Sequence, residues 1–544
     1  MQRFSLALLA LLATNAMIDA AYSQLGDDID GTNSDDESGT SISLSSDGVR
    51  LAVGSPRHSG RRGTTRVFEY SNDTWTQLGS DIDGYDGAGS DYFGQSVSLS
   101  SNGARVAIGA PGTWTAAGPS SGKVRIYELG PFGVPGVIPS WSLMGGDIDG
   151  EGLNDLSGQC LSMSADGLRA AIGAPGNSAT GPNKGHVRVF EYSGGAWSQL
   201  GSDIDGTAAS GEAGTCVSTS SDGTRVAIGA PKAAAGGTQR GQVMVFEYSG
   251  GAWSQLGSDI DGEGDNDQSG DACSLSDDGT RLAIGSHRNG VGGTANDAGH
   301  VRLFEFSSGA WAQLGSDIDG SAGDKLGSSV SLTSDGSRVA IGAYASGEGG
   351  AQSGSLKVFE WASGAWSQVG STFAGEAAFD RAGEHVQGVA FSSNGARVAY
   401  GASENDGSWN NAGHVRVFVD ASQTPPFLPP PPIAPPSAPP PLIPPAVPPP
   451  SIPPSAPPPP SPASPPTLPP PSPPSSPPQL PPSAPPAEDL TTLFILIGVG
   501  SLCFLASCFE YHFLVTTWEC WSVLRCRGKK SRTRTSQFPT PVKV

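Results

Sequence analysis

Six pairs of aspartates recur in the tetrapeptide Asp-Ile-Asp-Gly, and their carboxylate oxygens could coordinate a cation. The pairs are Asp28 and Asp30, Asp81 and Asp83, Asp147 and Asp149, Asp203 and Asp205, Asp259 and Asp261, and Asp317 and Asp319. Side chains alternate along a strand, so both aspartates of a pair lie on one face and the isoleucine on the other. Oxygen-rich loops with glycine suit Ca²⁺, which predicts weak calcium sites or an acidic face for a cationic ligand. The alternative is structural, because repeated aspartates also accept hydrogen bonds in turns and between repeats.

A second kind of chemistry is indicated by loops that differ from copy to copy. Trp114 and Trp409 stand in polar, glycine-rich loops, and a third such loop carries Arg57, Arg61 and Arg62. An indole offers a broad apolar face with one hydrogen-bond donor, so these residues are candidates for binding a sugar or a peptide. Each tryptophan could instead fill the gap to a neighbouring repeat.

Catalytic motifs are not evident, and we do not expect an enzyme. The chain has no nucleophile elbow, no metal spacing of His and Cys, and no phosphate loop joined to a helix. His186, His300 and His414 share one register, where other copies have Thr64, Lys123, Gln242 or Ser355. An exposed strand end explains these histidines better than a metal cluster. A carboxylate pair for lyase or glycosidase chemistry could still assemble across repeats without a linear trace.

The elements that position these residues come from one segment written seven times. It is a short apolar run, a Ser-x-Asp/Asn-Gly turn, an arginine and a second apolar run ending in glycine. The turns centre on Asp47, Asn102, Asp166, Asp222, Asp278, Asp335 and Asn394, roughly 55 to 64 residues apart. Such a period, made of strand-sized pieces, is typical of a radial or stacked repeat architecture.

Each period predicts four antiparallel strands, which is one propeller blade. In the third copy we expect strands over 159–164, 169–174, 186–192 and 197–201. The last copy stops at Phe418 without the Trp-x-Gln-Leu-Gly strand, and the related segment Tyr22–Gly26 stands at the start of the chain. If that segment completes the last blade, no sheet edge stays open. The prediction is an all-β fold, a closed seven-bladed β-propeller of four-stranded blades, rather than an open solenoid.

The second copy resembles the FG-GAP repeats that form the seven-bladed propeller of integrin α subunits. It contains Phe93-Gly94 followed by Gly109-Ala110-Pro111, and Gly-Ala-Pro recurs at Gly173 and Gly229. WD40 and TolB-type propellers share the Ser-x-Asp-Gly feature. The FG-GAP resemblance implies an extracellular ring for adhesion or ligand binding. Integrin-type repeats place a calcium loop between the two signatures, but here an arginine follows each turn, so we do not expect calcium at the turns. The arginines are expected to pair with carboxylates or carbonyls within the blade: Arg50, Arg105, Arg169, Arg225, Arg281, Arg338 and Arg397.

Three cysteines lie in the repeats, Cys160, Cys216 and Cys273, each on the first strand of its copy. Because their number is odd and they fall on different blades, we interpret them as buried packing residues and not as a disulfide framework. The single sequon, Asn72-Asp73-Thr74, lies in a hairpin turn where glycosylation of Asn72 is sterically allowed.

Composition divides the chain into segments beyond the ring. Residues 1–20 have the layout of a secretory signal peptide, 21–420 hold the propeller, and 421–489 form a stalk that contains most of the 47 prolines. The stalk resembles extensin-like plant and algal glycoproteins in composition, and a disordered linker is the alternative reading. Residues 490–510 are long enough to cross a bilayer, and the basic tail 511–544 is expected in the cytoplasm.

These features predict a type I single-pass plasma-membrane protein with the propeller outside the cell. The net charge of −21 argues against nucleic acid as a partner. The expected function is adhesion or ligand binding, with an extracellular glycan or matrix protein as partner and no cofactor beyond a possible Ca²⁺. The alternatives are a structural wall or surface-coat glycoprotein and, less favoured, an extracellular lyase or glycosidase.

Overall fold

The repeated Ser-x-Asp/Asn-Gly segments form tight turns that join the first two strands of each repeat. In the third copy, the Asp166 carboxylate accepts hydrogen bonds from the Ser164 hydroxyl (2.7 Å) and the Leu168 amide (2.8 Å). Gly167 takes a φ of 68°, which glycine adopts without steric cost. The turn thereby holds strand β13 (Leu161–Met163) antiparallel to β14 (Arg169–Ala174).

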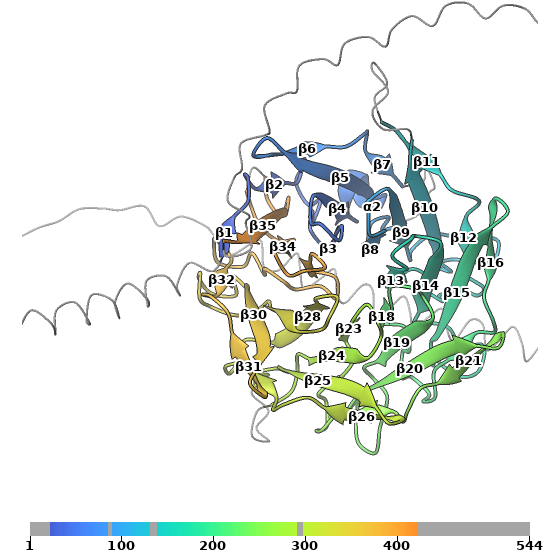
Figure 1. Ribbon diagram of the computed structural model, residues 1–544. Helices are drawn as coiled ribbons and strands as arrows, with labels where there is room; N and C mark the ends of the chain where they lie inside the picture. The colour runs from blue at the N-terminus through green and yellow to red at the C-terminus, as the bar shows by residue number, and fades with distance from the viewer. Residues whose placement is uncertain (1–21, 85–89, 131–138, 291–296, 408, 422–544) are drawn as a thin grey trace, which may run out of the picture. The chain divides into compact units, whose positions relative to one another are not determined.

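The computed structural model describes residues 22–84, 90–130, 139–290, 297–407 and 409–421. Their strands form seven antiparallel sheets arranged radially in a ring (Figure 1). Each sheet has four main strands and a fifth strand of two residues. This short strand comes from Asp-Ile-Asp-Gly or the equivalent segment, and it pairs with the start of the third strand. The all-β, seven-bladed prediction is therefore confirmed.

The first four blades follow one another along the chain. Blade 1 contains β3 (Ser41–Leu44), β4 (Arg50–Ser55), β5 (Thr64–Ser71), β6 (Thr74–Gln77) and β7 (Ile82–Asp83), with the short helical segment α2 (His58–Arg61) between β4 and β5. Blade 2 contains β8 (Ser96–Leu99), β9 (Arg105–Ala110), β10 (Lys123–Leu129), β11 (Trp141–Leu143) and β12 (Ile148–Asp149). Blade 3 contains β13, β14, β15 (His186–Ser193), β16 (Ala196–Gln199) and β17 (Ile204–Asp205). Blade 4 contains β18 (Cys216–Thr219), β19 (Arg225–Ala230), β20 (Gln242–Ser249), β21 (Ala252–Gln255) and β22 (Ile260–Asp261).

The last three blades complete the circle. Blade 5 contains β23 (Ala272–Leu275), β24 (Arg281–Ser286), β25 (His300–Ser307), β26 (Ala310–Gln313) and β27 (Ile318–Asp319). Blade 6 contains β28 (Leu326–Leu332), β29 (Arg338–Ala343), β30 (Ser355–Ala362), β31 (Ala365–Gln368) and β32 (Phe373–Ala374). Blade 7 contains β33 (Val389–Phe391), β34 (Arg397–Ala402) and β35 (His414–Asp420), together with β1 (Tyr22–Gln24) and β2 (Ile29–Asp30) from the start of the chain.

Blade 7 is closed by the N-terminal strand, as the incomplete last repeat predicts. In β1, Tyr22 pairs with Asp420 and Gln24 with Phe418, and this register places Tyr22 where Trp75 stands in blade 1. The indole Nε1 of Trp75 then donates a hydrogen bond to the Leu25 carbonyl at 2.8 Å, which ties the closing strand to the next blade. Figure 1 shows β1 and β2 beside β35.

A circle of backbone hydrogen bonds joins all seven blades next to their first turns. In each bond the amide of the residue before the turn's Asp or Asn donates to the equivalent carbonyl in the next blade, at 2.7 to 3.0 Å. The donors, in order, are Ser46, Ser101, Ala165, Ser221, Asp277, Ser334 and Ser393, and the bond from Ser393 returns to Ser46.

Glycine meets glycine where adjacent blades pack together. A Cβ on Gly109, in β9, would lie 2.1 Å from the carbonyl oxygen of Gly158 at the entry of blade 3. A Cβ on Gly229 would lie 1.9 Å from the carbonyl of Gly270 in the same way. This close approach gives a physical reason for the Phe-Gly and Gly-Ala-Pro signatures, because one glycine of each faces the other across the blade boundary.

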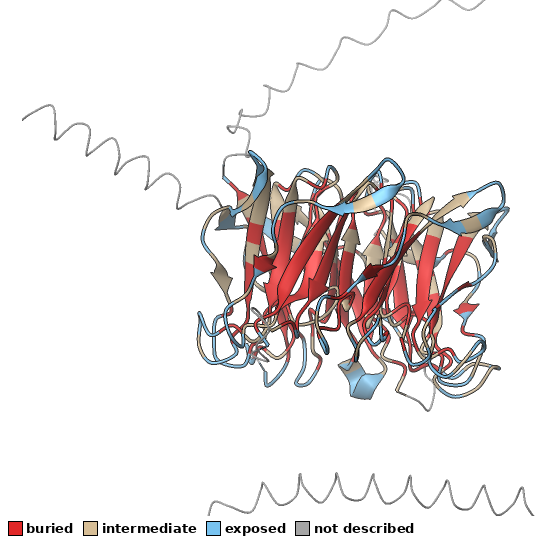
Figure 2. Cartoon of the chain, turned by 90° about the horizontal axis from the view of Figure 1, so that it is seen from below, coloured by how far each residue is buried: buried red, intermediate tan, exposed pale blue. Residues whose placement is uncertain are grey.

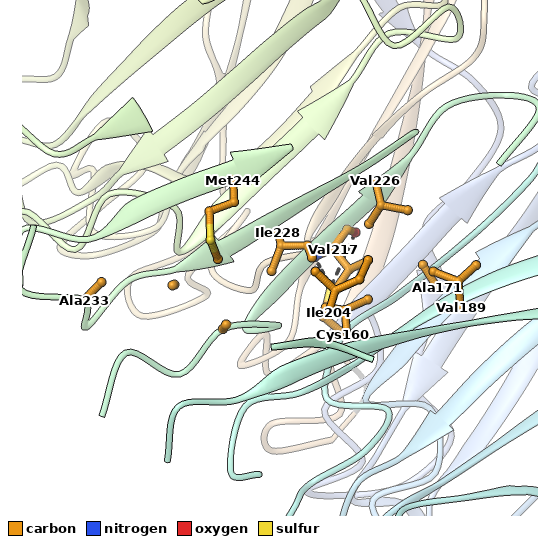
Figure 3. Packing of buried hydrophobic residues seen from close by; sticks show 12 residues of the cluster. Cys160, Ala171, Val189, Ile204, Val217, Val226, Ile228, Ala233 and Met244 are labelled. Carbon is orange, nitrogen blue, oxygen red and sulfur yellow. Dashed lines mark hydrogen bonds between the residues drawn. The ribbon is translucent and has the colours of Figure 1, made fainter. Parts of the chain in front are cut away.

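The core is divided between blade boundaries, with buried residues along the strands and exposed residues at both faces of the ring (Figure 2). One such cluster packs Cys160 and Val189 of blade 3 against Val217, Ile228 and Met244 of blade 4 (Figure 3). We call the repeated interactions that hold neighbouring blades together the frame of the ring, and the repeated tryptophans belong to it. In the described blades each donates its indole N–H to a carbonyl of the preceding blade at 2.7 to 2.8 Å: Trp75, Trp141, Trp197, Trp253, Trp311 and Trp366.

The central channel is bridged by Gln387. Its side-chain amide donates to the Leu161 carbonyl at 2.7 Å, and its side-chain oxygen accepts the Val97 amide at 3.0 Å. Around it the first strands leave a hollow of about 160 Å³. One side chain of blade 7 therefore connects blades 2 and 3 across the axis.

The interpretation of the ring cysteines as unbridged packing residues is wrong for two of them. Cys216 and Cys273 form a disulfide between blades 4 and 5, with their Cα atoms 6.0 Å apart. Cys160 is a buried free thiol. The prediction failed because a separation of 57 residues equals one repeat, and one repeat brings equivalent first-strand positions side by side.

The predicted signal peptide, membrane span, basic tail and all but residue 421 of the stalk lie outside the described residues. Within the described residues, no helix is long and apolar enough to cross a membrane.

Candidate functional site

The ring has two faces with different contents. The turn face carries the turns around Asp47 and its equivalents and the hairpins between third and fourth strands. The loop face carries the loops between second and third strands and the connections between blades, including Asp-Ile-Asp-Gly. The pairing of Thr64 with Asp83 at the start of β5 places both kinds of segment on one face.

The arginines that follow the turns are bound on the turn face. Arg105 contacts Glu128 of its own blade at 2.7 Å and donates to the Asp166 carbonyl of the next blade at 2.6 Å. Arg169, Arg225 and Arg281 repeat the pattern. In blade 7, Arg397 donates to the Gly48 carbonyl at 2.8 Å. Pairing within the blade is confirmed for Arg105, Arg169, Arg225 and Arg281, whereas the bond of Arg397 runs to the next blade. The bond to the next blade is an addition that sequence reasoning missed.

The first aspartate of each Asp-Ile-Asp-Gly pair accepts a hydrogen bond in the frame. In five blades the donor is the glutamine four residues earlier, at 2.6 to 2.7 Å, as for Gln24 and Asp28 or Gln199 and Asp203. The accepting residues are Asp28, Asp81, Asp203, Asp259 and Asp317. Asp147 instead meets Lys123 at 2.6 Å and Arg125 at 2.7 Å. Burial acts to raise the pKa of Asp147, but these two cations outweigh it and lower the pKa.

The second aspartate contributes mainly through its backbone. The carbonyls of Asp30, Asp149 and Asp261 accept Arg66, Arg188 and Arg302 of the next blade at 2.6 to 2.7 Å. Asp83, Asp205 and Asp319 pair through their backbones with the first residue of the third strand. Burial and the nearby Asp317 raise the pKa of Asp319. In the part of the chain that the structure describes, no cluster of three potential metal ligands includes a second aspartate. Calcium binding at the pairs stays a prediction.

Trp114 lines a surface hollow of about 500 Å³ on the loop face, between blades 2 and 3. Its other walls include the aromatic side chain of Tyr92 and the polar side chains of Gln95, Ser120 and Gln159. Trp114 is 66% exposed and Trp409 57% exposed. This exposure favours a binding role over a tryptophan that fills a gap between blades, and the binding role stays a prediction.

Arg57 and Arg61 line a second hollow, of about 620 Å³, beside α2 in blade 1. Its opposite wall is the entry loop of blade 1, with Asn33, Asp35 and Asp36. Arg57 forms an ion pair with Glu37 at 2.8 Å, whereas Arg62 is only partly exposed and does not line the hollow. The site thus combines exposed cations with carboxylates.

Backbone contacts join the three predicted binding loops into one continuous surface. Tyr92 donates to the Arg61 carbonyl at 3.0 Å, which connects the hollow of Trp114 to that of Arg57 and Arg61. On the other side, the Asp35 amide donates to the Asn410 carbonyl at 2.9 Å, next to Trp409. Trp409, the arginines and Trp114 therefore belong to consecutive blades, namely 7, 1 and 2. Asn72, the predicted glycosylation site, is exposed on the turn face instead.

The three histidines in one register are not exposed strand ends, and that interpretation is wrong. His186, His300 and His414 are each 1% exposed. Burial lowers the pKa of all three, to about 4 for His300. Each meets two carboxylates in a cluster: Glu151, His186 and Asp203; Glu263, His300 and Asp317; and Asp28, Glu376 and His414. The signal for these clusters was available, because a glutamate follows the glycine at the entry of blades 3, 5 and 7 alone.

The comparison with protein families gives one match. The FG-GAP repeat model matches residues 75–127, which run from Trp75 in β6 to Tyr127 in β10. The chain carries an FG-GAP repeat. The matched segment includes Phe93-Gly94 and Gly109-Ala110-Pro111, and one glycine of each signature, Gly94 or Gly109, meets a glycine of a neighbouring blade.

Solved structures resemble this propeller only in part. Hydrazine synthase from Kuenenia stuttgartiensis has 12% identity and a TM-score of 0.43, covering 72% of this chain and 97% of the other. The periplasmic gluconolactonase of Pseudomonas aeruginosa has 16% identity and a TM-score of 0.42, covering 65% and 87%. A putative 6-phosphogluconolactonase from Bacteroides uniformis has 13% identity and a TM-score of 0.43, covering 62% and 85%. No curated protein matches the chain in sequence.

Proposed function

We propose that this propeller is an extracellular recognition module that binds a glycan through the surface formed by blades 7, 1 and 2. The observation that carries the proposal is the continuity of that surface, on which Trp114, the arginine loop and Trp409 follow one another. Aromatic faces bordered by neutral amides and hydroxyls suit the apolar faces and hydroxyl groups of a sugar.

The proposal includes attachment to the plasma membrane through the Pro-rich segment and residues 490–510. Asp420, near the end of the described chain, lies at the turn-face end of β35, where its backbone pairs with Tyr22. The described chain therefore ends on the face of the ring opposite the proposed binding surface. The disulfide between blades 4 and 5 favours an oxidising, extracellular compartment.

The test is binding of the purified full-length chain, in detergent, to arrays of glycans and of matrix proteins. We expect saturable binding to a glycan class that falls at least tenfold in Trp114→Ala and in Trp409→Ala. Leu143→Ala, which removes an exposed apolar side chain from β11, is the control and should bind normally.

Three results would overturn the proposal. Unchanged glycan binding in both tryptophan variants would remove the loop surface from recognition. Binding only to matrix proteins would replace the glycan with a protein partner, and turnover of a bound glycan would favour the lyase or glycosidase alternative.

A further inference from the structure

The clusters around His186, His300 and His414 lie on the loop face, in blades 3, 5 and 7, and their residues are not among those proposed above to bind a glycan. Each combines one imidazole with two carboxylates from different segments: the glutamate at the blade entry and the first aspartate of the Asp-Ile-Asp or N-terminal segment that completes the blade. All the candidate ligand atoms of a cluster lie within 4.8 Å of one another.

We propose that each of these three clusters binds a divalent transition-metal ion of the zinc type, with one histidine nitrogen and two carboxylate oxygens as ligands. The donor set favours such an ion over Ca²⁺, because imidazole suits zinc-like metals whereas Ca²⁺ takes six to eight oxygens.

One oxygen of each carboxylate binds a neighbouring side chain of the ring, and the other oxygen faces the imidazole. Gln313 donates to Oδ1 of Asp317 at 2.6 Å, while Oδ2 lies 3.8 Å from Nδ1 of His300. In the cluster of His414, Arg416 binds Oδ1 of Asp28 at 2.9 Å and Oε1 of Glu376. The other oxygens, Oδ2 of Asp28 and Oε2 of Glu376, each lie 3.8 Å from Nδ1 of His414.

These separations are too long for hydrogen bonds and fit an ion between the two atoms. Zinc bonds to nitrogen and oxygen of about 2.0 to 2.1 Å place the two ligand atoms about 3.4 Å apart at the tetrahedral angle. The 3.8 to 4.0 Å found from each Nδ1 to its carboxylates is slightly longer, so the carboxylates would move in by about half an ångström on binding the ion.

The buried histidines supply independent support, because they have polar atoms that the protein does not satisfy. Both ring nitrogens of His186 lack a hydrogen-bond partner, and so do Nε2 of His300 and Nε2 of His414. Nδ1 of His186 is the atom that faces Asp203, at 3.9 Å. Buried polar groups are rarely left unpaired, so the unmet Nδ1 of His186, aimed at Asp203, indicates a ligand at this cluster.

Blades 2 and 4 have other side chains at the histidine position, and these show what takes the place of the proposed ion. In blade 2, Lys123 stands at the histidine position, and its ammonium lies 2.6 Å from Asp147 and 3.2 Å from Asp149. A built-in cation thus occupies this place. In blade 4, Gln242 stands at the histidine position. Its side-chain amide donates a hydrogen bond to the Thr207 hydroxyl at the blade entry at 2.8 Å, so these two residues bind each other without a cation. Glutamate at the blade entry and histidine on the third strand occur together in blades 3, 5 and 7, and in those blades alone.

The test exchanges two residues between blades 4 and 5 in the full-length chain, one at the blade entry and one at the histidine position. The double variant Glu263→Thr/His300→Gln copies blade 4 into blade 5. The reverse variant Thr207→Glu/Gln242→His copies blade 5 into blade 4, where Asp259 supplies the remaining carboxylate. Each protein is stripped with a chelator, dialysed against Zn²⁺ with excess Ca²⁺, and measured for bound zinc and for melting temperature.

We expect the first variant to hold one zinc fewer per chain than the wild type and the second to hold one more. Zinc should raise the melting temperature of the wild type, and Ca²⁺ should not replace it. Cysteines of the C-terminal segment can also bind zinc, so the readout is the difference between variants. Equal zinc content in all three proteins would overturn the proposal. If one variant fails to fold, the other still decides, because a structural role for His300 predicts no additional zinc in blade 4.

Discussion

On the turn face of blades 1 to 5, the arginine after the turn makes the same two contacts, one to a glutamate of its own blade and one to a carbonyl of the next. On the loop face, consecutive blades place Lys123, His186 and Gln242 at one register, each with different partners. The seven repeats are thus uniform where blades are held together and divergent where a ligand can reach. Mutations at shared positions should therefore change the stability of the whole ring, and mutations at divergent positions should change binding.

Removal of the closing strand should have the largest effect. Deleting residues 22–26 removes the pairing of β1 with β35 and the acceptor of the Trp75 indole. Because every blade depends on its neighbours, we expect cooperative loss of the folded ring, measured by circular dichroism and by limited proteolysis. Ser23→Ala, at an exposed position of the same strand, is the control. A melting temperature within a few degrees of the wild type would show that closure does not hold the ring.

The glycine contacts between blades should come next. In Gly229→Ala the new Cβ would lie 1.9 Å from the Gly270 carbonyl, so blades 4 and 5 must move apart. We expect a loss of about 3 kcal/mol in the free energy of unfolding, the upper end of typical overpacking costs.

Gly146→Ala is the matched control, because a Cβ there meets nothing within 4 Å and the residue is not in the left-handed region. It should leave stability unchanged or raise it slightly. Equal costs for the two substitutions would contradict the close approach of the blades as the reason for the FG-GAP glycines.

A smaller effect is expected at Tyr22, and it depends on pH. Burial raises the pKa of Tyr22 to about 12, and its hydroxyl donates to the Gly395 carbonyl at 3.1 Å. A raised folded-state pKa means that this contribution is complete below the ordinary pKa of about 10 and is lost as the pH rises toward 12. Tyr22→Phe should cost about 1 kcal/mol at neutral pH and should lose less stability than the wild type between pH 10 and 12. Parallel unfolding curves for the two proteins across that range would contradict a buried Tyr22 hydroxyl.

The frame was predictable from the sequence because each of its interactions repeats. The strand 169–174, the turn at Asp166 and the closing strand at Tyr22 all follow from a local pattern read several times. The disulfide and the histidine clusters were missed for the opposite reason. Cys216 meets Cys273, and His300 meets Glu263, only after the ring brings distant segments together. Burial of the histidines could not be inferred from their polar neighbours in the sequence, and the carboxylates beside them come from the preceding and following connections.

The smallest effect on stability should come from a tryptophan of the loop face, and the same substitution in the frame provides the contrast. Trp197 donates to the Met144 carbonyl at 2.8 Å and packs against the core between blades 2 and 3, whereas Trp114 is 66% exposed. Trp197→Ala should therefore cost about 3 kcal/mol, and Trp114→Ala should stay within about 0.5 kcal/mol, as surface substitutions usually do. Chemical denaturation of both variants measures the difference. A large cost for Trp114→Ala would mean that this residue belongs to the frame, and any loss of glycan binding in that variant would then report unfolding and not a lost contact.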